Sequence, residues 1–272
     1  MNKEINKTVL KHYVDGCVER VLISESQLEY RIFISCPKEA PPANGYPVIY
    51  ALDGDAIFNT LAEAARLQTR KPHGYDPVVI VGIGYPSREP FDMKRRCYDF
   101  TMPAEAENLP KRPNGEEWPE RGGANVFLDF IETELKPELA GEYPIDPSRQ
   151  TIFGHSLGGL FVLHALFNRP QSFQTYVAGS PSIWWNNHAL LNELDAFESR
   201  MLQAEEKSRL LLTIGADELT HMVEDAEHLI ASLQSLHIFH AQIVKFSEEG
   251  HVSVLPAALS RLLKFALVSS SA

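Results

Sequence analysis

The residues Gly154-His155-Ser156-Leu157-Gly158 match the pattern G-x-S-x-G, in which the serine can act as a nucleophile. Residues 150–154 before the serine have a strand-like pattern, and residues 157–167 after it have a helical one. A sharp strand-to-helix turn places the serine oxygen at the positive end of the helix, where a developing negative charge is favoured. Because the bare pattern also occurs in glycine-rich turns without chemistry, Ser156 needs partners elsewhere in the chain.

The same arrangement requires an acid after a later strand and a histidine after the last strand, in the order Ser, acid, His. His251 follows the final strand-like segment and precedes the last helical one, where a general base is needed. Glu218 directly follows the preceding strand-like segment and is the first candidate for the acid that orients the imidazole. Asp217 and Asp225 are alternatives, and so is a pair of Ser156 and His251 without an acid.

Acyl transfer also needs two hydrogen-bond donors for the negative oxygen of the tetrahedral intermediate. One is expected to be the backbone N–H of Leu157, the residue after the nucleophile. The second is expected in the loop after the segment VIYALDG, at Gly54 or Asp55. Only the backbone acts at these positions, so the residue type does not decide between the last two.

Strand-like and helical segments alternate along the chain and must position these residues. Residues 18–26 and 28–36 are β-rich and are separated by a polar turn, which predicts an antiparallel pair. The later alternation predicts an α/β fold with a mainly parallel sheet covered by helices on both faces and antiparallel strands at its N-terminal edge. The expected later strands are 46–54, 76–86, 150–154, 173–180, 209–216 and 240–249, and the expected helices are 55–68, 123–139, 157–167, 189–203, 221–236 and 252–268.

The chain has 272 residues, and we expect residues 1–272 to form a single domain. Residues 85–122, rich in Pro, Arg and Glu, are predicted to be one long irregular insertion. A loop of that length inside a compact domain is usually a lid or a substrate loop, and an insertion without a role is the alternative.

The composition excludes several classes of function. The net charge of −11 argues against binding of nucleic acids or anionic membranes, because phosphates would be repelled. Three widely spaced cysteines give neither a disulfide framework nor a zinc pattern, so reduced thiols are expected. The first residues lack the pattern of a signal peptide, and the chain has no apolar run of about 18 residues. We therefore expect a cytoplasmic protein.

With these residues in place, the chain resembles the Putative esterase (esterase D-like) branch of the α/β-hydrolases, and in particular the siderophore trilactone esterases that act on enterobactin and salmochelin. The resemblance covers nearly the whole chain and implies the α/β-hydrolase fold. It is carried by VIYALDG (48–54), RRCYDFT (95–101), GHSLGGLFVLHAL (154–166), SPSIWW (180–185), IGADE (214–218) and EEGHVSV (249–254).

The resemblance also implies roles for residues outside the G-x-S-x-G pattern. Arg95 or Arg96 would line the acyl pocket, with surface ion pairing as the alternative. Trp184 and Trp185 would wall the site, with core packing as the alternative for one of them. Some trilactone esterases act with a Ser-His pair alone, which leaves the role of Glu218 open.

The expected function is hydrolysis of a small-molecule carboxylic ester through an acyl-enzyme, with siderophore trilactones as candidate substrates. No metal or organic cofactor is expected, and a ferric ion would arrive only as part of a siderophore. The alternatives are acyl transfer to an alcohol, as in the mycolyltransferases, hydrolysis of thioesters such as S-formylglutathione, and ligand binding without catalysis. The sequence determines neither the natural ester nor the oligomeric state.

Overall fold

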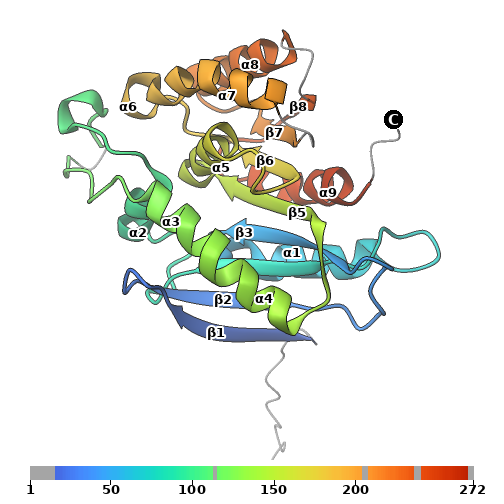
Figure 1. The fold of residues 1–272 in the computed structure, drawn as a ribbon. Coiled ribbons are helices and arrows are strands. Elements are labelled where there is room, and N and C mark those ends of the chain that lie inside the picture. Colours follow the sequence, from blue (N-terminus) through green and yellow to red (C-terminus); the bar gives the residue numbers. More distant parts are fainter. Residues whose placement is uncertain (1–15, 113–114, 204–207, 236–239, 269–272) are drawn as a thin grey trace, which may run out of the picture.

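A mixed β-sheet lies at the centre of the computed structural model, which describes residues 16–112, 115–203, 208–235 and 240–268 (Figure 1). Among these residues the sheet has eight strands in the order β1-β2-β4-β3-β5-β6-β7-β8. The strands are β1 (Cys17–Ile23), β2 (Glu29–Ser35), β3 (Tyr46–Leu52), β4 (Val79–Gly84), β5 (Ile145–His155), β6 (Thr175–Gly179), β7 (Arg209–Gly215) and β8 (His240–Phe246).

The strand directions agree with the expected mixed sheet. β1 pairs antiparallel with β2, and β2 pairs antiparallel with β4. From β4 to β8 all neighbouring strands are parallel. Every residue of β3 and β4 is buried, which explains why these strands read as continuous apolar runs rather than as an alternation. The carboxyl ends of β3 to β8 therefore meet at one edge of the sheet.

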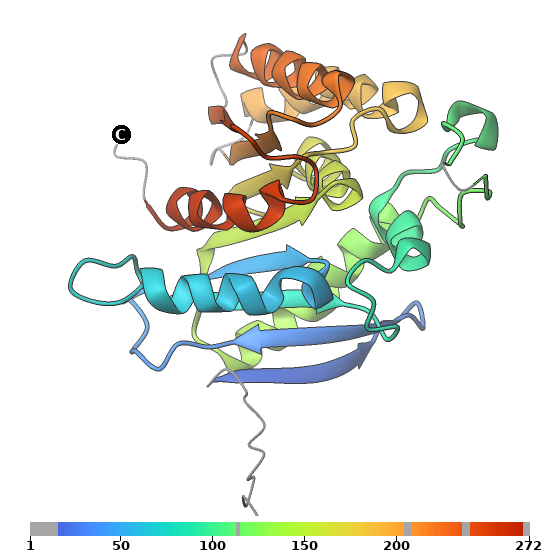
Figure 2. The same ribbon diagram turned by 180° about the vertical axis from the view of Figure 1, so that it is seen from behind.

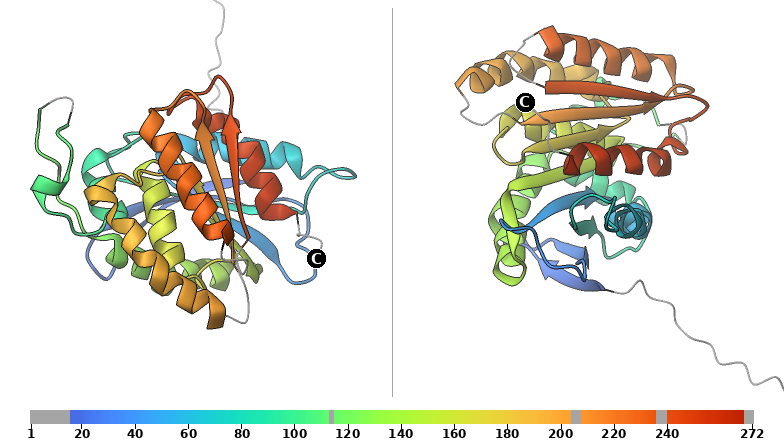
Figure 3. Two further views of the ribbon diagram at one scale, coloured as in Figure 1. Left: turned by 90° about the horizontal axis from the view of Figure 1, so that it is seen from above. Right: turned by 90° about the vertical axis from the view of Figure 1, so that its right-hand side faces the viewer.

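Helices cover both faces of the sheet and enclose two apolar clusters (Figures 1 and 2). α1 (Gly54–Gln68) and α9 (Val254–Leu267) lie on one face. The other face is covered by α3 (Ala124–Phe130), α4 (Lys136–Glu142), α5 (Leu157–Asn168), α7 (Leu194–Gln203) and α8 (Thr220–Ser235). Figure 3 shows β7 and β8 between α8 and α9.

Two expected helices have a more detailed form than predicted. The helix expected over 123–139 runs from α3 into α4 through a π-helical turn, η2 (Ile131–Leu135). The helix expected over 189–203 begins as a 3-10 segment, η3 (Ala189–Glu193), and continues as α7. The last residue of the expected helix 221–236 and the N-terminal residues 1–15 lie outside the described part of the chain.

The prediction that residues 85–122 are irregular throughout is wrong for part of the segment. It contains α2 (Met93–Phe100) and the 3-10 turn η1 (Ala106–Asn108). Asp92 caps α2 by accepting a hydrogen bond from the backbone N–H of Arg95 at 3.0 Å. The buried face of α2 includes Arg96 and Asp99. These charged residues interrupt the apolar stripe by which an amphipathic helix is normally found in a sequence.

A helix that crosses a bilayer needs about 20 predominantly apolar residues. In the described ranges, no helix combines the length and the apolar character needed to cross a membrane.

Candidate active site

Ser156 occupies the turn between β5 and α5. Its backbone has φ 61° and ψ −117°, a left-handed conformation that a residue with a side chain rarely adopts. Two hydrogen bonds hold it there: the N–H of Ser156 donates to Gly179 O at 2.8 Å, and the N–H of Ser182 donates to Ser156 O at 3.1 Å. The turn is thus fixed by β6 and by the segment that follows it.

The first glycine of the motif is required by a close approach of the chain to itself. A Cβ at Gly154 would lie 2.3 Å from the carbonyl oxygen of Gly158. A Cβ at Gly158 itself would meet only ordinary contacts, at 3.6 Å. Gly159 has less room for a side chain than Gly158, because a Cβ there would lie 2.7 Å from Gly179 O.

The structure brings Ser156, His251 and Glu218 into one hydrogen-bonded chain. His251 Nε2 lies 3.1 Å from Ser156 Oγ, and His251 Nδ1 lies 2.7 Å from Glu218 Oε2. Because Glu218 is an acceptor when ionised, Nδ1 carries the proton and Nε2 is free to accept the hydroxyl proton of Ser156. The three residues follow the ends of β5, β8 and β7, so the sheet edge positions them.

Glu218 is completely buried at its side chain and has a full set of donors. Its Oε1 accepts hydrogen bonds from Ser180 Oγ at 2.5 Å and from the Gly215 N–H at 2.9 Å. Burial raises the pKa of Glu218, but the hydrogen bonds from His251, Ser180 and Gly215 outweigh it and hold the pKa below its usual range. The carboxylate is therefore charged at neutral pH and can stabilise a protonated imidazole.

The alternative acids lie elsewhere. Asp217 is exposed, and its N–H donates to Glu249 O at 3.0 Å. Asp225 lies 3.0 Å from His188 Nε2. Of the three acids considered from the sequence, Glu218 is the one in contact with His251.

Two expected oxyanion donors are the first residues of the helices that follow the paired strands β3 and β5. Leu157 begins α5 and Gly54 begins α1, so their N–H groups belong to helix termini, which have no partner within the helix. Asp53, just before α1, has φ 53°, and its Oδ2 would lie 3.6 Å from a Cβ at Gly158. The loop after β3 therefore lies against the first turn of α5. Oxyanion binding by Leu157 and by Gly54 or Asp55 stays a prediction.

The two arginines expected at the acyl pocket bind acceptors of the protein itself. Arg96 Nε donates to Asp53 Oδ1 at 2.8 Å, and its Nη2 donates to His155 O at 3.2 Å. Arg95 donates to Glu29 O at 2.9 Å and to Asp99 Oδ2 at 3.2 Å. Contact of either guanidinium with a ligand stays a prediction.

The adjacent tryptophans differ in burial. Trp185 is fully buried and packs edge-on against Trp118 at 5.0 Å between ring centroids, so it is a core residue. Trp184 is half-buried and lines a cavity of about 320 Å³. The other lining residues are Glu107, Asn108, Leu109, Pro110, Asn187 and His221. Ser182, two residues before Trp184, has its Oγ 3.4 Å from Ser156 Oγ, but neither of these serines lines the cavity.

Comparison with known proteins identifies the family. The family model described as Putative esterase matches residues 24–259. The chain belongs to this family. The ferri-bacillibactin esterase BesA of Bacillus subtilis is 48% identical over 262 residues, which cover 93% of this chain and 90% of BesA. The siderophore triacetylfusarinine C esterase of Aspergillus fumigatus is 37% identical, with 79% of each chain covered.

This esterase is also similar to a solved structure along nearly its whole length. The crystal structure of the BES protein from Bacillus cereus has a TM-score of 0.91 and 38% identity, and the match covers 97% of this chain and 100% of that one. The predicted α/β-hydrolase fold and the predicted carboxylic ester hydrolase are thereby confirmed.

The sequence does not predict the turn at Asn187, which lines the cavity beside Trp184. Asn187 and its neighbours Asn186 and His188 are all left-handed, with φ of 50°, 50° and 62°. Asn187 Nδ2 donates to Asn108 Oδ1 at 3.1 Å, which joins this turn to η1. The only sequence signal was the pair of asparagines, a residue type that tolerates left-handed backbone.

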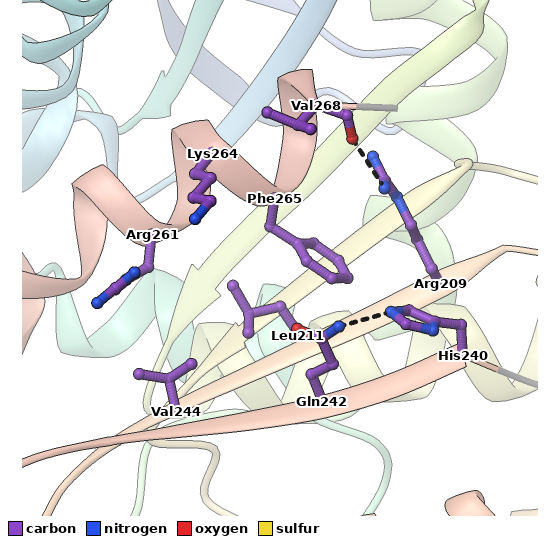
Figure 4. Close-up of a pocket in the computed structure, with 9 residues that line it drawn as sticks. All are labelled: Arg209, Leu211, His240, Gln242, Val244, Arg261, Lys264, Phe265 and Val268. Atoms are coloured by element: carbon purple, nitrogen blue, oxygen red, sulfur yellow. Dashed lines mark hydrogen bonds between the residues drawn. The ribbon is translucent and has the colours of Figure 1, made fainter. Parts of the chain in front are cut away.

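A second cavity, of about 340 Å³, lies between α9 and the first halves of β7 and β8 (Figure 4). It is lined by Arg209, Leu211, His240, Gln242, Val244, Arg261, Lys264, Phe265 and Val268. Glu218 and His251 follow the other ends of these two strands, so this cavity is separate from the Ser156 site. Among the described residues, no group of three or more His, Cys, Asp or Glu side chains could hold a metal ion.

Proposed function

We propose that this esterase hydrolyses the ester bonds of siderophores, with Ser156, His251 and Glu218 as its catalytic residues. The chemistry rests on the hydrogen-bonded chain from Ser156 Oγ through His251 to Glu218. The substrate class rests on the names of two relatives, a ferri-bacillibactin esterase and a triacetylfusarinine C esterase.

In the first half of the reaction His251 Nε2 takes the proton of Ser156 as Oγ attacks the ester carbonyl. Glu218 holds Nδ1–H and stabilises the imidazolium that forms. The N–H of Leu157 and an N–H at Gly54 or Asp55 bind the oxyanion of the tetrahedral intermediate. His251 then protonates the leaving alcohol, which leaves an acyl-enzyme.

In the second half a water molecule replaces the alcohol. His251 takes a proton from the water as it attacks the acyl-enzyme. When the second tetrahedral intermediate collapses to the carboxylic acid, His251 returns that proton to Ser156 Oγ. The residues of this chain suffice for these steps, and any ferric ion belongs to the substrate. Residues 107–110 of the predicted insertion line the cavity beside Trp184, which supports a substrate-contacting role for the insertion.

The cytosol is the compartment that we propose for the reaction. The described cysteines Cys17, Cys36 and Cys97 are free thiols, as expected in a reducing compartment.

The test is an ester panel on the purified protein, with Ser156→Ala as the blank. It contains apo and ferric trilactones of the bacillibactin and enterobactin type, a fusarinine ester, p-nitrophenyl esters from acetyl to octanoyl, and S-formylglutathione. We expect kcat/KM on a siderophore ester to exceed that on the simple esters at least about 100-fold. Comparable values on short simple esters, or a preference for S-formylglutathione, would contradict the siderophore assignment. Ester products with added alcohols would indicate acyl transfer instead.

A further inference from the structure

We infer that Arg96 is a positioning residue that holds together the two helix starts expected to bind the oxyanion. This inference rests on the proposed function. Arg96 lies in α2, within the predicted insertion, and reaches two other parts of the chain. Its Nε binds Asp53 Oδ1 at 2.8 Å, next to the start of α1. Its Nη2 binds the carbonyl of His155 at 3.2 Å, next to Ser156 and the start of α5.

The two points that Arg96 joins are both strained. Asp53 and Ser156 have φ of 53° and 61°, and each immediately precedes the first residue of a helix. Left-handed backbone in residues with side chains persists only where neighbouring contacts impose it. A change of backbone conformation in either turn would move the N–H of Gly54 or Leu157 away from the reacting carbonyl. The hydrogen bonds from Arg96 to Asp53 Oδ1 and to His155 O, the Arg96 brace, join the two turns and fix the distance between these two donors.

Burial and packing make the brace rigid. The side chains of Arg96 and Asp53 are 5% and 3% exposed, so water competes little for their hydrogen bonds. The guanidinium lies 5.1 Å from the ring centroid of Phe91 and 5.7 Å from that of Phe100, which restricts its orientation. A Cβ at Gly158 would lie 3.6 Å from Asp53 Oδ2, so the loop before α1 packs against the first turn of α5.

An arginine is needed for this brace because two acceptors on different elements must be bound at once. The planar guanidinium presents several N–H groups in a fixed fork, whereas a lysine ammonium is a single point charge on a flexible stem. Arg96→Lys therefore keeps the charge beside Asp53 but loses the simultaneous bond to His155 O. The variant separates positioning from charge.

The experiment compares Arg96→Lys with Arg149→Lys. Arg149 is a matched control, because it also binds one carboxylate and one carbonyl: Asp76 Oδ2 at 2.8 Å and Leu267 O at 3.2 Å. We expect kcat of Arg96→Lys to fall about 100-fold, as for a small displacement of an oxyanion donor, while KM stays within about threefold. For Arg149→Lys we expect kcat within about twofold of wild type.

A trifluoromethyl ketone with the acyl group of the assayed ester gives the second readout. Ser156 Oγ bonds to its carbonyl carbon, His251 takes the serine proton, and the new oxyanion occupies the place of the transition-state oxygen. The inhibition constant of Arg96→Lys should rise by the same factor as kcat/KM falls. A purely structural role would lower the melting temperature without this parallel change.

Each outcome decides the inference. If Arg96→Lys matches Arg149→Lys in kcat and inhibition, or raises KM with kcat unchanged, Arg96 does not position the oxyanion donors. If Arg96→Lys fails to fold, Asp53→Asn, which keeps the shape of the partner, carries the same comparison with an expected loss in kcat of about tenfold. Unchanged kcat in that variant would equally overturn the inference. Retention of activity in Ser156→Ala would instead overturn the proposed function, so the two failures are distinguishable.

Discussion

The two ends of β5 carry similar side-chain contacts in different surroundings. Near the amino end, Arg149 binds one carboxylate and one main-chain carbonyl, at 2.8 Å and 3.2 Å. Beyond the carboxyl end, Arg96 makes the same pair of contacts at the same two distances. The side chain of Arg149 is 26% exposed, and that of Arg96 is 5% exposed.

The backbone beside these contacts differs as well. Arg149 joins the final turn of α9 to Asp76, before β4, at a partly solvated end of the sheet. Arg96 lies beside left-handed residues at Asp53 and Ser156. Partly exposed ion pairs contribute little to stability, whereas buried contacts beside a strained turn can determine its geometry. We therefore interpret the amino end of β5 as scaffold and the carboxyl end as the reacting end.

Serines at the two ends of β5 give the largest predicted contrast. Ser156→Ala should lower kcat on any accepted ester by about 10⁴-fold or more, because the nucleophile is lost. Ser148 lies at the amino end, where its Oγ donates to Asp146 at 2.6 Å, and Ser148→Ala should leave kcat nearly unchanged. Steady-state kinetics on one chromogenic ester measures both. A Ser156→Ala enzyme with half the wild-type activity would remove Ser156 from the mechanism.

Histidines at the two ends of β8 provide the next contrast. His251→Gln should lower kcat by about 10⁴-fold, because the general base acts as a unit with the serine. His240, at the start of β8, stacks on Phe265 and lines the second cavity (Figure 4). His240→Gln should keep wild-type turnover. Equal losses in the two variants would mean that His251 contributes through folding rather than through proton transfer.

The neighbouring acids at the end of β7 should differ by a smaller factor. Glu218→Gln should lower kcat by more than about tenfold, because the amide cannot stabilise the imidazolium as a carboxylate does. Asp217→Asn, one residue earlier and exposed, serves as the control and should have little effect. A loss below tenfold in Glu218→Gln would favour a Ser156–His251 pair that acts without an acid.

The smallest predicted effect concerns stability in acid. Burial, followed by the charge of His251, lowers the pKa of His155 to about 3, against 6.5 for an unperturbed histidine. As the pH falls below 6.5 the unfolded chain binds a proton that the folded protein excludes, so His155 destabilises the folded state increasingly from about pH 6.5 down to about pH 3. His155→Gln should flatten this part of the stability curve by up to about 1.4 kcal/mol per pH unit.

Urea unfolding between pH 7 and pH 5, followed by tryptophan fluorescence, measures this slope. His240→Gln is the control for the substitution itself, because it makes the same change at an exposed position. Identical slopes in His155→Gln and wild type would contradict the depressed pKa of His155.

Residues whose positions follow from a local motif or from the order of the strands could be predicted from the sequence. The G-x-S-x-G pattern located Ser156, and the order of strands located His251 and Glu218, because a parallel sheet gathers its carboxyl ends at one edge. The strands and long helices could be predicted from their apolar periodicity, because this periodicity reflects burial on one or both faces. The hydrogen bonds that join these three residues agree with that reasoning.

The remaining features depend on contacts between distant segments. α2 was missed because Arg96 and Asp99 stand on its buried face, where a local pattern would have apolar residues. Arg96 pairs with the distant Asp53, and Asp99 pairs with Arg95 of the same helix. Trp184 and Trp185 both pack against Trp118, more than sixty residues earlier in the chain, at 6.3 Å and 5.0 Å between ring centroids. The cavity beside Trp184 brings η1, the left-handed turn at Asn187 and the start of α8 together, so its lining could not be read from any one of them.

The central claim, that Ser156 is the activated nucleophile, is tested most directly by mass spectrometry after treatment with a fluorophosphonate. The reagent should add one phosphonyl group to the wild-type protein and to Ser148→Ala, on the peptide that contains Ser156, and none to Ser156→Ala. An adduct on any other residue, or equal labelling of Ser156→Ala, would contradict the account.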